Sequence, residues 1–278
     1  MNKGISSVAF PAGMTIKEMF AEAKKHGFDG VELSMNASGE LTTDTGLEEL
    51  RQIKNEADNA GITLYSVTSG VCWMYSLTSD DEAQRGLAKE NVKKQLDIAA
   101  RLGCETILVV PGHVGVDFAP HLGVVEYETA YNRALNAIGE LVPYAESAGV
   151  VMGIENVWNK FLVSPLEVRS FIDEINSPYV KAYFDVGNVL INSYPEHWIT
   201  ILGNRIAKVH FKDFKRSIGN INGFCDLLAG DVDYKAVMSA FKSVGYDGWV
   251  TAEVTPYVGD NSVMLSHTSA AMDYIIDI

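Results

Sequence analysis

A regular alternation limits how this chain can fold more than any other feature of its sequence. Short apolar runs rich in β-branched residues alternate with longer segments of helical periodicity, from one end of the chain to the other. This pattern is typical of repeated strand–helix units around a parallel sheet. Eight segments have the character of buried strands: residues 4–9, 29–34, 62–67, 106–110, 150–155, 180–185, 206–211 and 249–253. Eight more have the helical period: residues 15–26, 47–60, 81–102, 127–148, 165–175, 196–203, 234–244 and 262–276.

Glycine residues mark where several of the predicted helices stop. In five places a glycine ends the helical period and a strand follows within a few residues. Glycine adopts the left-handed conformation that ends a helix at little steric cost, so each position lets the chain turn back into the sheet. The five are Gly27, Gly61, Gly103, Gly149 and Gly245.

Open doubly wound sheets also alternate strands and helices, so closure of the sheet needs its own argument. No GxGxxG motif follows the first predicted strand, and the dinucleotide-binding form of the open sheet therefore loses its main support. At 278 residues the chain is close to the length of a (β/α)₈ barrel, typically about 250 residues. No linker rich in Pro, Gly or Ser divides it. We therefore predict an α/β fold, a single TIM barrel, with residues 1–278 in one domain.

Composition narrows the class of protein. The formal net charge is −14 and the chain lacks clusters of Lys and Arg, which argues against a nucleic-acid partner. Its three cysteines are far apart in the sequence and form no CxxC pair, so a disulfide framework or zinc ribbon is not expected and a reducing cytosol fits best. There is no secretory signal pattern and no apolar run of about 20 residues. We expect a cytoplasmic protein without a membrane partner.

Four residues of the kinds that bind metals fall at the ends of the last four predicted strands. They are Glu155, Asp185, His210 and Glu253. Alone, a carboxylate at a strand end more often caps a helix or forms a loop salt bridge. In a closed parallel barrel, however, these four ends converge on the C-terminal face, where three carboxylates would repel one another without a cation. One imidazole with three carboxylates suits Mn²⁺, Mg²⁺ or Co²⁺, and we predict one such ion.

Short motifs around these residues resemble those of a known superfamily. The motifs are GIEN at 153–156, DVGN at 185–188, HFKD at 210–213 and AEV at 252–254. They look like the four metal-ligand motifs of the xylose-isomerase-like barrels, and the similarity spans nearly the whole chain, including FDGVEL at 28–33 and AARLG at 99–103. The second and third motifs most resemble sugar-phosphate epimerases acting on pentulose 5-phosphates. The related ketose 3-epimerases carry a histidine three residues after the metal-binding aspartate, where this chain has Asn188.

The resemblance implies a reaction as well as a fold. It implies a metal-dependent isomerase or epimerase acting on a sugar or sugar phosphate, with the ion stabilising an enediolate. Glu155 and Glu253 would be the catalytic pair, one removing a proton and the other returning one. Return to the opposite face of the carbon gives 3-epimerisation of a ketose or ketose phosphate, whereas use of one face gives aldose–ketose isomerisation.

Candidate contacts to a carbohydrate substrate come both from the family resemblance and from the positions of residues relative to the predicted strands. By resemblance, Arg216 lies six residues beyond His210, where the ketose epimerases place a substrate-binding arginine. Lys212 shares the inward parity of His210 if the seventh strand runs that far, and either cation could hold a phosphate or hydroxyl. The alternative for both is a loop salt bridge with Asp213. Glu32, at the end of strand two, could bind either substrate hydroxyl groups or the groups that support the metal ligands. The remaining candidates follow strands four, five and six, and are His113, Trp158 and Asn188.

Rival functions share the barrel or the chemistry. An endonuclease IV-like phosphodiesterase would need a multi-metal cluster with additional histidines, whereas this chain has six histidines, few of them at strand ends, and a negative charge that opposes DNA binding. An inosose-type dehydratase or a ketone isomerase would use the same metal and the same proton abstraction. A sugar-binding barrel without catalysis would not need two bases. Related barrels often self-associate, so a homo-oligomer is an expectation.

Overall fold

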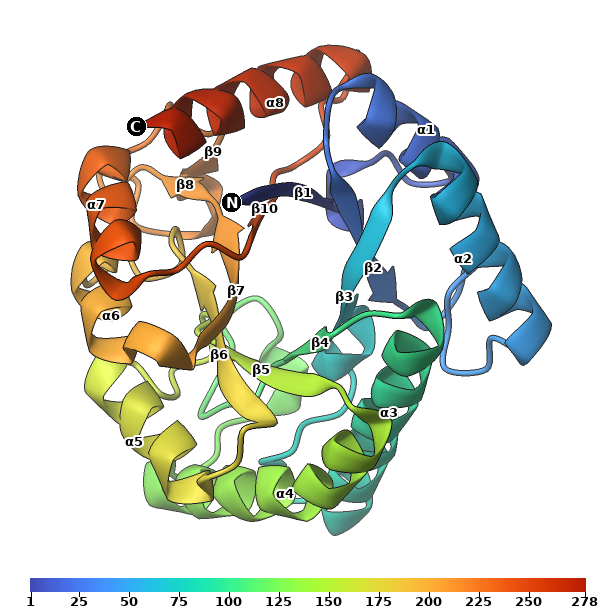
Figure 1. The fold of residues 1–278 in the computed structure, drawn as a ribbon. Coiled ribbons are helices and arrows are strands. Elements are labelled where there is room, and N and C mark those ends of the chain that lie inside the picture. The colour runs from blue at the N-terminus through green and yellow to red at the C-terminus, as the bar shows by residue number, and fades with distance from the viewer.

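The computed structural model describes residues 1–278 and confirms the predicted barrel. Eight parallel strands form a closed ring, with the first strand paired to the last one of the ring (Figure 1). Around the ring the order is β1, β10, β7, β6, β5, β4, β3 and β2. The strands are β1 (Asn2–Ser6), β2 (Gly30–Met35), β3 (Thr63–Ser69), β4 (Thr106–Val109), β5 (Val151–Glu155), β6 (Val180–Asp185), β7 (Ile206–Phe211) and β10 (Trp249–Ala252).

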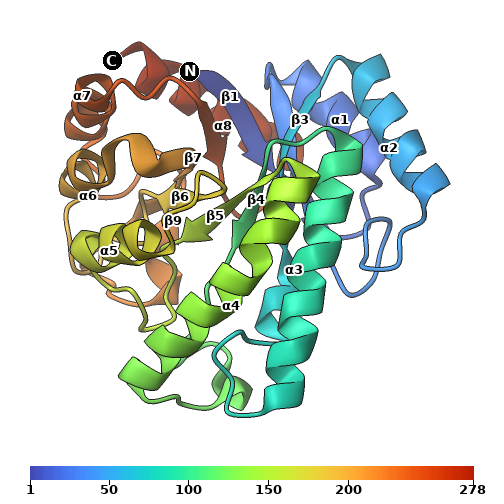
Figure 2. The same ribbon diagram turned by 60° about the horizontal axis from the view of Figure 1, so that its bottom comes forward.

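The helices form an outer ring that covers the strands (Figures 1 and 2). All five glycines expected to end helices have positive φ angles, between 68° and 78°, as the left-handed conformation requires. None of the helices combines the length and the apolar character needed to cross a membrane. They are α1 (Ile16–Lys25), α2 (Leu47–Ala60), α3 (Glu82–Leu102), α4 (Tyr127–Ala148), α5 (Pro165–Ile175), α6 (Pro195–Leu202), α7 (Tyr234–Val244) and α8 (Asn261–Asp277).

The first strand lies earlier in the chain than the apolar pattern predicts. The pattern indicates residues 4–9, but β1 ends at Ser6 and Ser7–Ala9 forms a turn of 3₁₀ helix. Its position is set by its partner, because Asn2 to Ile5 pair with the four residues of β10. Ala9 and Phe10 are buried without belonging to the ladder, so their apolar character reflects packing and not strand pairing.

Small residues inside the ring make room for large polar ones. A Cβ atom built on Gly153 of β5 would lie 2.8 Å from the ring of Tyr183 on β6, so only glycine fits beside this tyrosine. On the opposite side, the Tyr65 hydroxyl lies 2.7 Å from the Thr251 hydroxyl oxygen. The interior is therefore a packed core, and reactive groups can gather only at its C-terminal end.

The loop after β7 folds over that end of the barrel. It contains a two-stranded hairpin of β8 (Asp213–Phe214) and β9 (Phe224–Cys225). Its centre is the buried Asp213 carboxylate, which accepts hydrogen bonds from four backbone N–H groups at 2.8 to 3.2 Å. These belong to Phe214, Leu228, Gly230 and Val232.

Candidate active site

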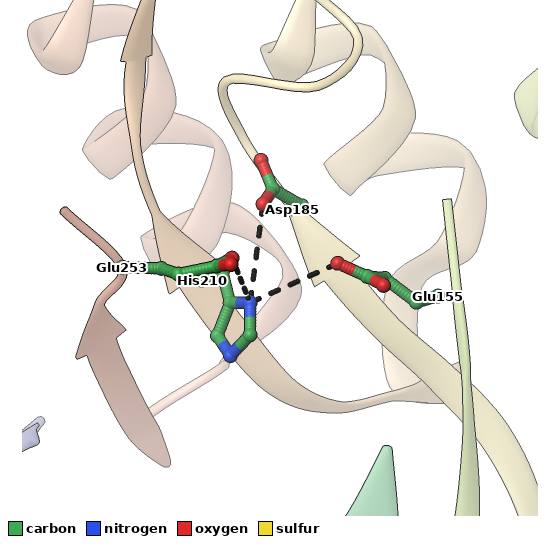
Figure 3. A group of neighbouring side chains, drawn as sticks. All are labelled: Glu155, Asp185, His210 and Glu253. Carbon is green, nitrogen blue, oxygen red and sulfur yellow. Dashed lines mark ion pairs between the residues drawn. The ribbon is translucent and has the colours of Figure 1, made fainter. Parts of the chain in front are cut away.

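Four side chains from neighbouring strands meet at the C-terminal mouth of the barrel. Glu155 ends β5, Asp185 ends β6, His210 belongs to β7, and Glu253 directly follows β10 (Figure 3). One potential ligand atom from each lies within 4.8 Å of the others. Glu155, Asp185 and His210 are buried, and Glu253 is partly exposed. The arrangement is the one that the strand-end positions predict, and it could hold a metal ion.

The polar atoms that face the centre of this cluster lack good hydrogen-bond partners. Asp185 Oδ2, His210 Nδ1 and Glu253 Oε2 are buried without one. His210 Nδ1 lies 2.9 Å from Glu253 Oε2, and 3.9 Å from both Glu155 Oε1 and Asp185 Oδ2. Buried polar atoms normally form well-aligned hydrogen bonds. These three atoms have only one another and the Lys212 ammonium group nearby, and a bound cation would give them a common partner. Oxygen and imidazole nitrogen donors fit Mn²⁺, Mg²⁺ or Co²⁺.

The two glutamates of the cluster have opposite pKa shifts. Burial raises the pKa of Glu155 to about 8, and the nearby Glu253 carboxylate adds to the rise. Burial acts on Glu253 in the same direction, but the positive charges of Lys212 and His210 outweigh it and hold the pKa of Glu253 well below its ordinary value. The neighbouring cations therefore act more strongly on the Glu253 carboxylate than on that of Glu155.

Glu32 on β2 orients the histidine. Its side chain is fully buried; Oε1 lies 2.9 Å from His210 Nε2, and Oε2 accepts a hydrogen bond from the Tyr183 hydroxyl. Because Nε2 donates to this carboxylate, Nδ1 is the nitrogen that faces the cluster. A carboxylate that fixes the orientation of a ligand histidine is common at metal sites. The geometry therefore favours a role for Glu32 in orienting His210 over a direct contact with substrate hydroxyl groups.

Lys212 joins the cluster from the residue just after β7. Its Nζ atom lies 2.8 Å from Glu253 Oε2 and 3.1 Å from Asp185 Oδ2, and not against Asp213. The Asp185 and Glu253 carboxylates raise the pKa of Lys212 above its ordinary value even though burial opposes this. Gly187 allows the close approach, because a Cβ atom there would lie 2.8 Å from Lys212 Cβ. The inward parity expected of Lys212 is observed.

The residues after β5 and β6 brace the Asp185 backbone. The Asn156 side chain accepts a hydrogen bond from Asp185 N at 2.9 Å and donates one to Asp185 O at 2.8 Å. Asn188 donates from its side chain to Asn156 O at 3.0 Å, and the Trp158 indole donates to Asn188 O at 2.8 Å. Trp158 and Asn188 line a separate cavity of about 220 Å³. Their proposed contact with substrate remains a prediction.

The side chains of two other candidates, His113 and Arg216, contact groups outside the cluster. The His113 ring is buried, with Nε2 3.2 Å from Leu122 O in the loop after β4. The Arg216 guanidinium lies over the Tyr194 ring at 5.2 Å, and its Nε donates to Leu190 O at 3.2 Å. The structure therefore does not bring either side chain to the cluster of Glu155, Asp185, His210 and Glu253.

A cavity of about 750 Å³ opens beside the cluster, over the ends of β7 and β10. Lys212 and Glu253 form part of its wall, and the loops after β1, β7 and β10 supply the rest. Phe224 and Tyr257 give it aromatic surface. A small organic molecule in this space would contact Glu253 directly.

Two residues of the site were absent from the sequence-based candidates, namely Tyr183 and Asn156. Tyr183 precedes Asp185 by two residues on β6, so strand periodicity alone places both on the inner face. Asn156 follows Glu155 in the GIEN motif, but its bonds to Asp185 depend on how β5 and β6 pair, which the sequence does not state.

Comparison with known proteins agrees with this geometry. Residues 20–270 match the model of a protein family described as xylose isomerase-like TIM barrel. The chain belongs to this family. Among family relatives, the chain is 26% identical over 255 residues to the putative L-ribulose-5-phosphate 3-epimerase SgbU of Haemophilus influenzae, covering 88% of this chain and 85% of the relative. It is 26% identical over 253 residues to L-ribulose-5-phosphate 3-epimerase UlaE of Escherichia coli, covering 88% and 84%.

Solved structures of other proteins show the same fold. A crystal structure of D-psicose 3-epimerase in the presence of D-fructose has a TM-score of 0.82 and 20% identity, covering 99% of this chain and 98% of that one. L-Ribulose 3-epimerase has a TM-score of 0.82 and 18% identity, covering 100% and 95%. The sequence relatives named here are thus L-ribulose-5-phosphate 3-epimerases, one of them putative, and the two ketose 3-epimerase structures share the fold.

Proposed function

We propose that this protein is a metal-dependent epimerase that inverts C3 of a ketose. The observation that carries the proposal is the pair of glutamates: Glu155 and Glu253 come from different strands and direct carboxyl groups to the same point, beside a cavity. The names of the relatives support the same reaction class. A carbohydrate is the proposed partner.

Glu155, Asp185, His210 and Glu253 would hold one divalent ion, Mn²⁺, Mg²⁺ or Co²⁺. When bound, this ion supplies Lewis acidity that stabilises negative charge on the carbonyl oxygen of the substrate. The Glu32 carboxylate keeps His210 Nδ1 directed at the cluster. Asn156 fixes the backbone of Asp185 by two hydrogen bonds.

The glutamates move the proton. A carboxylate oxygen of one removes the C3 hydrogen as a proton, and the carboxyl group of the other delivers a proton to the opposite face of the same carbon. Lys212, on the cavity wall, would donate hydrogen bonds to substrate oxygens and keep Glu253 oriented through its 2.8 Å contact.

Proton exchange measured by NMR tests the proposal. The Mn²⁺-loaded protein is incubated in D₂O with ketoses and ketose phosphates, and the Mn²⁺ is removed by chelation before spectra are recorded. Deuterium at C3 together with the C3 epimer is the expected result. Deuterium at C1 or C2 would replace epimerisation by aldose–ketose isomerisation, and loss of water from an inositol-derived ketone would replace it by dehydration. Exchange undiminished in Glu253→Gln would contradict the role of this residue.

A further inference from the structure

We infer that Asn156, Asn188 and Trp158 are positioning residues, which hold the Asp185 carboxylate in the orientation that a metal ion needs. This inference rests on the proposed function and concerns the metal site of that function. Asn188 and Trp158 are candidate substrate contacts on sequence grounds. Their hydrogen bonds, however, connect the turn after Asp185 to the end of β5 and to the loop that follows it.

The backbone ladder between β5 and β6 stops short of Asp185. Its last pair is Glu155 with Tyr183, and Asp185 lies two residues further along β6. The Asn156 side chain replaces the missing strand partner there: its oxygen accepts from Asp185 N at 2.9 Å, and its NH₂ group donates to Asp185 O at 2.8 Å. An amide side chain can accept and donate at the same time, whereas a carboxylate only accepts. Asn156 therefore extends the pairing of the sheet to the residue that carries the candidate ligand.

The turn after Asp185 orients its carboxylate. Asn188 N donates to Oδ1 at 2.8 Å. The other oxygen, Oδ2, faces His210 Nδ1 at 3.9 Å and Lys212 Nζ at 3.1 Å (Figure 3). Because Asp185 is fully buried, water does not compete for these oxygens. The position of the Asn188 N–H group therefore helps to decide which oxygen is directed at the cluster.

Two side chains hold that turn in place. The Asn188 side chain donates to Asn156 O at 3.0 Å, which connects the turn to the end of β5. The Trp158 indole N–H donates to Asn188 O at 2.8 Å. The indole also packs against Phe214 and Phe224 of the β8–β9 hairpin, with ring centroids 5.4 and 5.1 Å apart. Trp158 thus fixes the turn from the side of the loop after β7.

Asn156, Asn188 and Trp158 lie outside the main cavity. None of them lines the cavity that contains Glu253, and all three line the smaller cavity of about 220 Å³. Their influence on a reaction beside Glu253 would therefore pass through Asp185.

Metal affinity tests the inference without any substrate. Mn²⁺ is titrated into the protein, and the free ion is counted from its electron paramagnetic resonance signal. Asn156→Ala should weaken Mn²⁺ binding by at least about 10-fold, because Asp185 N–H and C=O lose their partner. Trp158→Phe removes one N–H donor but keeps an aromatic ring against Phe214, and should weaken binding by roughly threefold. Unchanged affinity in these two variants would overturn the inference.

Asn159→Ala is the matched control. Asn159 is buried in the same loop, where its side chain donates to Gly112 O at 2.7 Å and accepts from Phe161 N at 3.1 Å. Its side chain therefore joins the loops after β4 and β5 and not the turn after β6. This variant should lose stability and keep the Mn²⁺ affinity of the wild type. A loss of affinity equal to that of Asn156→Ala would overturn the inference, since it would report general damage to the loop.

Substrate kinetics separate positioning from contact. At saturating Mn²⁺, the KM for a ketose should be the same in Trp158→Phe as in the wild type, because the indole N–H acts on the metal site. A raised KM with unchanged Mn²⁺ affinity would overturn the inference and make Trp158 a substrate contact.

The two proposals can fail separately. If the wild-type protein binds Mn²⁺ but exchanges no proton at C3 of any ketose, the proposed function fails, and the metal titration still decides the inference. A wild-type protein without saturable Mn²⁺ binding would overturn both.

Discussion

Two buried aspartates near the mouth of the barrel, Asp185 and Asp213, differ in how completely the protein satisfies them. Asp213 accepts four backbone hydrogen bonds and holds a loop together. Asp185 accepts one at Oδ1, from Asn188 N, while its Oδ2 faces His210 and Lys212 without a good hydrogen bond. Burial raises the pKa of both carboxyl groups. They differ in that both oxygen atoms of Asp213 accept hydrogen bonds, whereas Oδ2 of Asp185 accepts none. This difference separates a structural acid from one available to a ligand.

The largest effect is expected from the glutamates next to Asp185. Glu155→Gln and Glu253→Gln should each lower the rate of C3 exchange by about 10³-fold, because an amide cannot accept and return the proton. The rate is measured by NMR in D₂O at saturating Mn²⁺. Glu105→Gln is the control, since this side chain pairs with Lys208 and belongs to neither the cluster nor the cavity. A comparable loss in the control would show that the assay reports general damage.

Metal addition should separate the two aspartates directly. With free Mn²⁺ at 100 times its Kd, binding stabilises the native state by about 2.7 kcal/mol, which corresponds to roughly 5–10 °C in Tm for a chain of this size. Asp185→Asn should lose most of this shift and Asp213→Asn should keep it. Thermal unfolding with Mn²⁺ and with a chelator measures both. Equal shifts in the two variants would remove the distinction drawn above.

In the absence of metal, Asp213→Asn should destabilise the protein more than Asp185→Asn does. Asp213→Asn places an NH₂ group among four N–H donors and should lower the free energy of unfolding by about 2 kcal/mol. Asp185→Asn should cost less, because the amide oxygen can still accept from Asn188 N and one of three clustered carboxylates loses its charge. Urea unfolding of the chelated proteins gives the two values. A larger loss in Asp185→Asn would contradict the assignment of Asp213 as the structural acid.

The smallest effects are expected from Glu32 and Tyr183, which support His210 from behind the cluster. Glu32→Gln should weaken Mn²⁺ binding by about 10-fold, since an amide holds the His210 ring less firmly than a carboxylate. Tyr183→Phe, which removes one hydrogen bond to Glu32, should weaken it by roughly threefold. Competition with a fluorescent chelator measures both affinities. If Tyr183→Phe had the larger effect, the tyrosine would act on the metal by another route.

The sequence was most informative where a residue's position depends on strand periodicity. Glu155, Asp185, His210 and Glu253 lie at strand ends, and a closed parallel barrel must bring those ends together. The position of β1 was harder to predict from the sequence, because it depends on pairing with β10, near the other end of the chain.

Side chains in loops were the hardest to place. Arg216 and His113 follow strands in the sequence, but their directions depend on hydrogen bonds to Leu190 and Leu122 that no periodicity encodes. Tyr183 shares the inner face of its strand with Asp185, yet its bond to Glu32 crosses the barrel between residues 151 positions apart. Local pattern predicts which side chains face inward, whereas the partners they meet follow from how the sheet closes.

Closure through β1 and β10 also fixes when the site can exist during synthesis. Until the ribosome has released β10, the growing sheet has two unpaired edges, at β1 and β7. Glu253 arrives directly after that last strand, so the step that removes the exposed edges also delivers the final acid of the cluster. A nascent chain is therefore expected to gain its complete set of candidate ligands only when its barrel closes.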